Sequence, residues 1–199
     1  MEQYPSIVGS AKAPLGKQCV AFNKYDGSNL RWEWNPKKGW AKFGTRRHLF
    51  DESDEQFKEA IPIFMNGMAD EIVLRTKEIV RNPQRITAFT EFFGPGSFAG
   101  SHVQGEQKEL RLFDVFLFQK GYVQPKQFVE VYGDMEQAAE IIYEGTLNSS
   151  FIMDVKKGEY PVFEGVIAKG SDFKVKIKTD EYFRCLRHKY PERWQEFGE

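Results

Sequence analysis

Apolar and polar residues alternate along the amino-terminal quarter of the chain, which is the pattern of half-buried β-strands. The predicted strands cover residues 19–23, 30–34 and 40–44, of which the last two alternate clearly, and the turn sequence NPKKG separates the second segment from the third. Another turn sequence, KYDGS, follows the first segment. We therefore expect mostly antiparallel strands in this part of the chain.

The apolar residues take up a helical period between residues 51 and 80. Spacings of three, four or seven separate the members of this set, which are Phe57, Ile61, Phe64, Met68, Ile72 and Ile79. Pro62 lies within the stretch, and a proline in the interior of a helix interrupts it. The pattern predicts one or two helices here, interrupted at Pro62.

Strand patterns return after the Asn82-Pro83 pair. They cover residues 86–93, 110–118, 162–169 and 173–179, and the last two form a hairpin around GSD. Asp134 can cap an amphipathic helix over residues 135–144, and the last twenty residues, aromatic and basic, are expected to be helical. With no internal repeat, the chain is predicted to be one α+β domain over residues 1–199, an antiparallel sheet with flanking helices.

The composition agrees with a folded domain and excludes several classes of protein. The chain has 199 residues, of which 41% are hydrophobic, and its net charge is -1, so intrinsic disorder is excluded as the main state. No apolar run approaches the roughly 20 residues of a membrane-spanning helix, and the first residues lack the apolar stretch of a secretory signal. Cys19 and Cys185 form no CxxC pair, so neither a disulfide framework nor a structural zinc site is expected. We expect a cytoplasmic, soluble monomer with no membrane partner.

The charges are segregated along the chain. Residues 12–47 hold nine basic residues against two acidic ones, a balance of +7, whereas residues 51–80 hold eight acidic residues against three basic ones, a balance of -5. Such segregation suits a protein that presents one face to a polyanion or a nucleotide, and it also arises from two solvated faces of opposite sign. The motifs, rather than the charge, have to decide between these interpretations.

Lys24 lies where a predicted strand ends in the glycine turn KYDGSN. A lysine at the end of a strand is held in place, and Gly27 lets the backbone pass close to a ligand. The amine is a nucleophile in its neutral form, which neighbouring cations favour. Most strand-end lysines face solvent instead, and this string alone does not distinguish the two cases.

Three lysines alternate along the last predicted strand, so that Lys174, Lys176 and Lys178 share one face. Glu164 lies on the strand before it, in FEGVIAKG. Three aligned lysines repel one another unless an anion lies over them, and phosphate is the obvious anion. The alternative is an exposed basic edge that discourages strand pairing, and the residues alone favour neither.

Two further strings place polar residues beside turns, and a third places an aromatic residue within a strand. Glu91 lies in a strand that ends at a GPG turn, where a ribose or a metal ion could approach. Arg46 and Arg47 follow a strand in FGTRRH, and the planar guanidinium group suits phosphate or sugar hydroxyls. Phe113, in LFDVF, could stack on a base, although a core position is more common for phenylalanine.

Six strings occur in order between residues 24 and 178: KYDGSN, GTRR, TEFFGPG, LRLFDVF, FEGVIAKG and KVKIKT. Together they resemble the six signatures of the covalent nucleotidyltransferases, the superfamily of ATP-dependent RNA and DNA ligases and messenger RNA capping enzymes. KYDGSN, with its Asn29, and TEFFGPG are most similar to RNA ligases of the phage T4 RNA ligase 2 type. The resemblance implies the ATP-grasp-like, antiparallel-sheet nucleotidyltransferase fold of ligase catalytic domains.

The resemblance also implies a reaction. Lys24 would attack the α-phosphate of ATP and carry AMP as a lysyl phosphoramidate, with Lys176 and Lys178 contacting that phosphate. AMP would pass to the 5'-phosphate of a nucleic acid, and a 3'-hydroxyl would then displace it. Mg2+ or Mn2+ would be coordinated or oriented by Glu164. Asp26 would be a second metal ligand, through water, or simply a turn former.

The remaining matches concern the nucleotide and the later steps. Glu91 would hold the ribose, and Phe113 would stack on the adenine. Arg46 or Arg47 would bind the sugar and phosphates, with Arg47 slightly favoured. Asn29 matches a position that acts after adenylation.

One feature of the family is not matched. Relatives carry an OB fold or a helical domain after the last lysine strand, whereas about twenty residues follow Thr179 here. We therefore expect no appended domain, which bears on nick sealing more than on self-adenylation. Either the catalytic module works alone on a simple substrate, or an accessory protein supplies the grip on the nucleic acid.

These observations predict an ATP-dependent RNA ligase that joins 5'-phosphate and 3'-hydroxyl ends, on free strands or in a nicked duplex. A minimal DNA ligase is the alternative, because the strings do not show how a 2'-hydroxyl would be contacted. A guanylyltransferase would normally need the missing OB domain. A nucleotide-binding module without ligase activity is a further alternative, against which all the expected charged residues are present.

Overall fold

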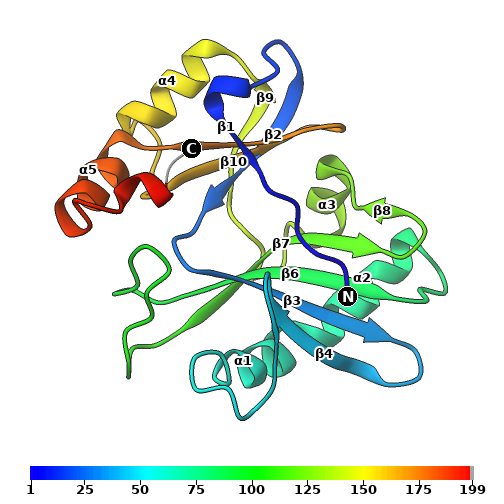
Figure 1. Cartoon of the computed structure of the whole chain (residues 1–199). Helices are drawn as coiled ribbons and strands as arrows, with labels where there is room; N and C mark the ends of the chain where they lie inside the picture. Colours follow the sequence, from blue (N-terminus) through cyan, green and yellow to red (C-terminus); the bar gives the residue numbers. More distant parts are fainter. Residues whose placement is uncertain (198–199) are drawn as a thin grey trace. The chain divides into compact units, whose positions relative to one another are not determined.

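The computed structural model describes residues 1–197, whose elements form two compact units (Figure 1). Unit 1 comprises Met1–Tyr4 and Gly27–Ala139, and unit 2 comprises Pro5–Asp26 and the chain from Glu140 onward. The chain therefore passes from unit 2 into unit 1 between Asp26 and Gly27, within the KYDGSN string.

Unit 1 is built on a six-stranded sheet in the order β5-β4-β3-β6-β7-β8, and all its neighbouring strands are antiparallel. The strands are β3 Ser28–Asn35, β4 Gly39–Thr45, β5 Leu49–Phe50, β6 Ile86–Phe93, β7 Glu109–Leu117 and β8 Gly121–Tyr122. The helices are α1 Ala60–Gly67, α2 Ala69–Ile79 and α3 Pro125–Tyr132.

One part of the core of unit 1 lies between this sheet and helix α1. Trp32 of β3 stacks on Phe64 of α1, with ring centroids 4.1 Å apart, and its indole N–H donates to Thr90 Oγ1 at 2.9 Å. All three residues are fully buried. Because alternate side chains of a strand point to opposite sides, Asn29 and Arg31 lie on the other face.

Unit 2 is built on a five-stranded sheet in the order β1-β11-β10-β2-β9, in which only the pairing of β1 with β11 is parallel. The strands are β1 Val8–Gly9, β2 Gln18–Lys24, β9 Ile141–Thr146, β10 Gly165–Lys169 and β11 Lys174–Lys178. The helices are α4 Ser149–Lys157 and α5 Asp180–Lys189, with 3-10 turns at η1 Ser10–Lys12 and η2 Trp194–Phe197.

Helix α4 covers the core of unit 2. It begins after Asn148, whose side chain accepts a hydrogen bond from the Phe151 backbone N–H at 2.8 Å, and it ends at Gly158, whose φ is +79°. These are the usual amino-terminal cap and left-handed glycine terminus of a helix. Phe151 and Val155 pack into the buried cluster with the apolar residues of the sheet, among them Val166.

The structure confirms the predicted fold class, because helices and largely antiparallel sheets make up both units. The strands predicted over residues 19–23, 30–34, 40–44, 86–93 and 110–118 are β2, β3, β4, β6 and β7. The predicted hairpin is β10 and β11, and the carboxyl-terminal helix is α5.

Three predictions about elements were wrong. Residues 135–144 do not form a helix: Ile141–Thr146 is strand β9, which pairs with β2, and Asp134 forms an ion pair with Arg75 instead of capping a helix. Pro62 does not interrupt α1, because it is the third residue of the helix, where a backbone N–H has no partner within the helix. Residues 162–164 precede β10 rather than belonging to it.

No helix in the part of the chain that the structure describes is both long and apolar enough to cross a membrane.

Candidate functional site

Lys24 is the last residue of β2, and the backbone beside it is unusually close-packed. Gly165, the first residue of β10, lies opposite both Lys24 and Lys178 in the strand register. Its φ is +142°, and a Cβ at this position would lie 2.0 Å from the carbonyl oxygen of Ile177. Only glycine fits at this position. The close packing brings together the end of β2, the start of β10 and the end of β11, directly after Glu164.

Glu164 joins two lysines. Its Oε1 lies 2.7 Å from Lys24 Nζ and 3.0 Å from Lys178 Nζ. The side chains of Glu164 and Lys178 are 4% and 6% exposed, whereas that of Lys24 is 23% exposed. We call these three residues the lysine cluster; they come from β2, from β11 and from the residue that precedes β10.

The electrostatics of the lysine cluster favour a further negative charge. Burial lowers the pKa of Lys178, and Lys24 lowers it too, while Glu164 acts in the opposite direction. Glu164 is shared by the two lysines, and Asp26, which also raises the pKa of Lys178, adds a second carboxylate. The third lysine, Lys176 on the same face of β11, makes the net charge positive toward an approaching phosphate. The cluster therefore fits the phosphates of a nucleotide.

Lys178 has contacts besides Glu164. Its Nζ donates to the carbonyl oxygen of Phe197 at 2.6 Å, and it lies 4.9 Å from the ring centroid of Tyr182. The hydroxyl of Tyr182 in turn donates to Asp26 Oδ1 at 3.1 Å. The sequence had not drawn attention to Tyr182 or Phe197, since neither belongs to any of the six strings.

Lys176 lies on the same face of β11 as Lys178 and is half-buried. It is paired across the sheet with Ile167 of β10 and with Gly9 of β1. Strand β11 thus lies between two other strands, and the interpretation of the lysines as an exposed sheet edge is wrong.

The carboxylates of Glu164 and Asp26 are the acidic groups that the sequence proposed as metal ligands. In the described residues no group of three or more His, Cys, Asp or Glu side chains is arranged to hold a metal ion. Mg2+ is commonly bound through one or two carboxylates, with water and substrate phosphates completing the shell. The two carboxylates fit that mode and not a metal site made by the protein alone.

In unit 1, two of the predicted residues are cross-strand partners. Asn29 of β3 lies opposite Glu91 of β6, on the face of the sheet away from Trp32. The Oδ1 atom of Asn29 is buried and has no hydrogen-bond partner among the described residues. A buried acceptor in this state is stabilised by a donor, which a ligand hydroxyl or amide could supply.

Phe113 of β7 packs on the same face. Its ring lies edge-on to Tyr4, with centroids 5.1 Å apart, and 6.5 Å from Phe89, which is two residues from Glu91 on β6. Phe113 is half-buried. It therefore belongs to an aromatic cluster without being fully buried.

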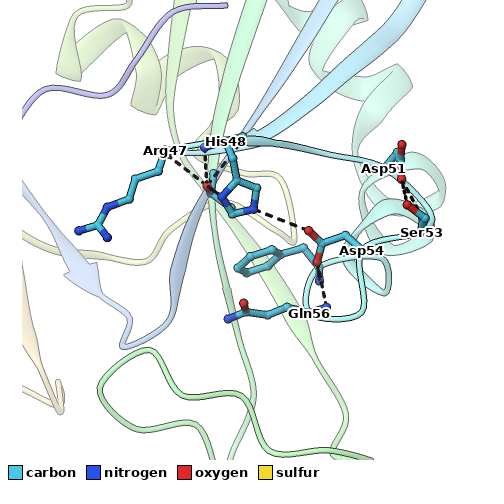
Figure 2. Close-up of polar contacts among 8 residues, drawn as sticks. Arg47, His48, Asp51, Ser53, Asp54 and Gln56 are labelled. Atoms are coloured by element: carbon cyan, nitrogen blue, oxygen red, sulfur yellow. Dashed lines mark hydrogen bonds and ion pairs between the residues drawn. The ribbon is translucent and has the colours of Figure 1, made fainter.

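Arg46 and Arg47 lie in the turn after β4, and both are exposed. The hydroxyl of Thr45 accepts hydrogen bonds from the backbone N–H groups of Arg47 and His48, each at 3.2 Å. His48 Nε2 lies 3.7 Å from Asp54 Oδ2, and the side chain of Arg47 points away from that pair (Figure 2). The turn presents both arginines, and its geometry does not select one of them.

No family model matches the chain, and no curated protein matches it. The solved structures that it resembles include an RNA ligase from Naegleria gruberi with pyrophosphate, at 15% identity and a TM-score of 0.66 over 97% of this chain and 59% of that one. A variant of that ligase with ATP and manganese is matched at 14% identity and a TM-score of 0.63, over 92% and 57% of the two chains. An archaeal ATP-dependent RNA ligase is matched at 12% identity and a TM-score of 0.65, over 97% and 52%.

At these identities the likeness concerns the fold. The chain has the fold of a large part of these ligases and spans little more than half of their length. This confirms the α+β nucleotidyltransferase fold that the six strings predicted.

Proposed function

We propose that this chain is an ATP-dependent polynucleotide ligase that acts on RNA through a lysyl-AMP intermediate. The observation that carries the proposal is the lysine cluster: a partly exposed lysine at a strand end, held at 2.7 Å by a buried carboxylate that a second, buried lysine shares. The six strings in order and the ligase fold support it. The match to ligase structures that contain pyrophosphate, ATP or manganese is consistent with the same chemistry.

In the proposed first step, the neutral amine of Lys24 attacks the α-phosphorus of ATP. A nitrogen–phosphorus bond forms, and the bond from that phosphorus to the bridging oxygen breaks, so that pyrophosphate leaves. Glu164 Oε1, at hydrogen-bond distance from Lys24 Nζ, is placed to accept the proton. Lys176 and Lys178 offset the charge on the α-phosphate, as positioned cations do in phosphoryl transfer.

A divalent cation, Mg2+ or Mn2+, would be held by Glu164 and Asp26 together with phosphate oxygens, and would supply further neutralisation of charge. In unit 1 we propose that Glu91 binds the ribose, that Phe113 stacks on the adenine and that Arg47, or Arg46, binds the sugar and phosphates. Stacking needs an accessible ring face, and Phe113 is half-buried rather than fully buried.

In the later steps, AMP passes from Lys24 to the 5'-phosphate of an RNA, and a 3'-hydroxyl attacks that phosphate and displaces AMP. We propose that Asn29 acts in these steps, after Lys24 is adenylated. Its buried Oδ1, without a partner in the described chain, is an acceptor suited to a hydroxyl of the nucleic acid or of AMP.

The experiment that tests the proposal is incubation of the protein with Mg2+ or Mn2+ and with ATP or GTP labelled at the α-phosphate, followed by denaturing electrophoresis. We expect label from ATP and not from GTP, and none in Lys24→Ala. Lys17→Ala is the matched control, because Lys17 belongs to the same unit, is exposed and is paired with Asp172. A labelled Lys24→Ala protein would show that the nucleophile is wrongly assigned.

The acceptor is tested separately. Adenylated protein is mixed with nicked duplexes and with single strands whose 3'-hydroxyl end is either RNA or DNA, and sealing is followed on a gel. Faster sealing at RNA ends supports the proposal, and equal or faster sealing at DNA ends replaces it with a DNA ligase. Protein that binds ATP and never becomes labelled would be a nucleotide-binding module.

A further inference from the structure

Helix α5 is fixed to the lysine cluster from its first residue. Thr179, which follows Lys178 directly, caps the helix by accepting a hydrogen bond from the Tyr182 backbone N–H at 3.0 Å. Its own hydroxyl donates to the Phe163 carbonyl at 2.6 Å, and its backbone N–H donates to the Glu164 carbonyl at 3.0 Å. The start of α5 is therefore held by the two residues that precede β10.

This anchoring sets the position of Tyr182, one turn into the helix. Tyr182 is 2% exposed, and its ring lies edge-on to Phe163 with centroids 5.5 Å apart. The ammonium of Lys178 lies 4.9 Å from the centroid of the same ring, within the range of a cation–π contact. The ring thus packs against the side chain of one lysine of the cluster.

The hydroxyl of Tyr182 reaches the turn that follows Lys24. It donates to Asp26 Oδ1 at 3.1 Å, and Asp26 is two residues from Lys24. A buried phenol needs a hydrogen-bond partner, and a carboxylate is a stronger acceptor than a neutral group. One side chain therefore contacts Lys178 with its ring and fixes the orientation of the Asp26 carboxylate with its hydroxyl.

We propose that Tyr182 is a positioning residue for the adenylation of Lys24. It acts through Asp26: the hydrogen bond holds the carboxylate, two residues after Lys24, in the arrangement that the chemical step requires. This inference rests on the function proposed above and adds a residue that lies outside all six strings. In the proposed reaction the role of Tyr182 is to orient Asp26, through the hydrogen bond from its hydroxyl.

The test compares Tyr182→Phe with Tyr143→Phe. The first variant keeps the ring and loses the hydroxyl, and the control loses a hydroxyl that donates to the Thr146 carbonyl at 3.0 Å in the same unit. In single-turnover adenylation we expect Tyr182→Phe to lower the maximal rate about tenfold, the size of one lost hydrogen bond to a charged group, with an ATP half-saturation changed less than twofold. Tyr143→Phe should leave both values unchanged.

A double-variant cycle separates positioning from a general loss of structure. In an Asp26→Ala background no carboxylate is left to orient, so adding Tyr182→Phe should change the rate less than twofold. Thermal unfolding of Tyr182→Phe should resemble that of Tyr143→Phe, and in a Lys24→Ala background, where no adduct forms, ATP should bind equally with Tyr182 or Phe at this position.

The outcomes are distinct. If the wild-type protein adenylates and Tyr182→Phe reacts at the rate of Tyr143→Phe, the positioning role is refuted while the proposed function stands. An equal loss in the native and Asp26→Ala backgrounds also refutes it, because Tyr182 would then act independently of that carboxylate. If the wild-type protein forms no adduct at all, both the function and this inference are overturned.

Discussion

Replacing Glu164 with glutamine should destabilise the protein by leaving a buried ammonium without its carboxylate. Glu164 is the shared partner of Lys24 and Lys178, at 2.7 and 3.0 Å. Glutamine has nearly the same shape, so the change removes the charge and leaves the packing in place. The prediction concerns folding stability alone and holds whether or not the protein is a ligase.

The magnitude follows from the exposure of the two lysines. Removing one partner of a buried ion pair costs about 3–5 kcal/mol. The side chain of Lys24 is 23% exposed and can be hydrated, whereas that of Lys178 is only 6% exposed. The substitution therefore leaves one buried ammonium, and not two, without a charged partner. The glutamine oxygen can still accept from Lys178. We therefore expect the free energy of unfolding to fall by about 3 kcal/mol, the lower end of that range. The midpoint of thermal unfolding should then be about 6–12 °C lower.

Urea and thermal unfolding, followed by circular dichroism, measure the effect on each variant. Lys178→Met is the matched variant, because it removes the buried charge and leaves Glu164 paired with Lys24; it should cost less than half as much as Glu164→Gln. The double variant Glu164→Gln/Lys178→Met leaves no buried charge without a partner, and it should be more stable than Glu164→Gln alone. A double variant less stable than Glu164→Gln, or a single variant within about 1 kcal/mol of the wild type, would refute this reasoning.

Two further predictions concern the backbone around the proposed site and the loop after β6. Gly165→Ala should lower the free energy of unfolding by about 2 kcal/mol or more, because its Cβ would meet the Ile177 carbonyl oxygen at 2.0 Å and its φ is +142°. Gly16→Ala is the control for backbone conformation alone, since its φ is +87° and nothing lies within 4 Å of the Cβ. An equal urea midpoint for the two variants would contradict the steric argument. Glu106 has a pKa lowered from 4.5 to about 2 by hydrogen bonds, first from Lys108 and then from Ser97 and backbone N–H groups. Since the unfolded state then binds more protons, the stability that Glu106 contributes is complete above about pH 4.5 and is lost as the pH falls towards 2. The stability difference between wild type and Glu106→Gln should shrink over that range, and a difference that is constant with pH would show that the carboxylate charge is not involved.

The sequence predicted the strands of unit 1 closely, because their apolar residues follow strand patterns that turn residues bound at each end. Ile86–Phe93 was predicted to the residue, and β3 extends only two residues before and one residue after the predicted segment. Such a pattern is a local signal, and it depends on nothing outside the strand. The register of Asn29 with Glu91 could not be predicted, since it depends on how the two strands pair.

The helix predicted over residues 135–144 shows where local reasoning fails. Asp134 beside a stretch with apolar residues has the form of a helix start, but Ile141–Thr146 pairs with β2, more than a hundred residues earlier in the chain. Strand formation depends on such non-local pairing more than helix formation does. Arg75 then takes Asp134 as its ion-pair partner.

The chemistry of the site was partly predictable, because alternation along a strand is a local signal. Alternation placed Lys174, Lys176 and Lys178 on one face, which holds, but it could not show that Lys178 is nearly buried while the other two are half-buried. That difference arises from the start of α5 and the turn at Phe197, which cover the end of β11. Tyr182 could not be found from the sequence, because its partner Asp26 is 156 residues away.

Aligned lysines need an anion, and the anion that Lys178 meets in this structure is a side chain of the protein itself. A lysine ammonium has three donors. Glu164 receives one and the Phe197 carbonyl receives another, so a phosphate at Lys178 would find a single donor unless the turn at Phe197 moved away. If the α-phosphate binds at this cluster, Lys176, next along the same face, has to supply the remaining contacts. Donor counting thus gives a physical reason for Lys176 beside Lys178 on β11, where Lys178 would suffice if it were not already engaged within the fold.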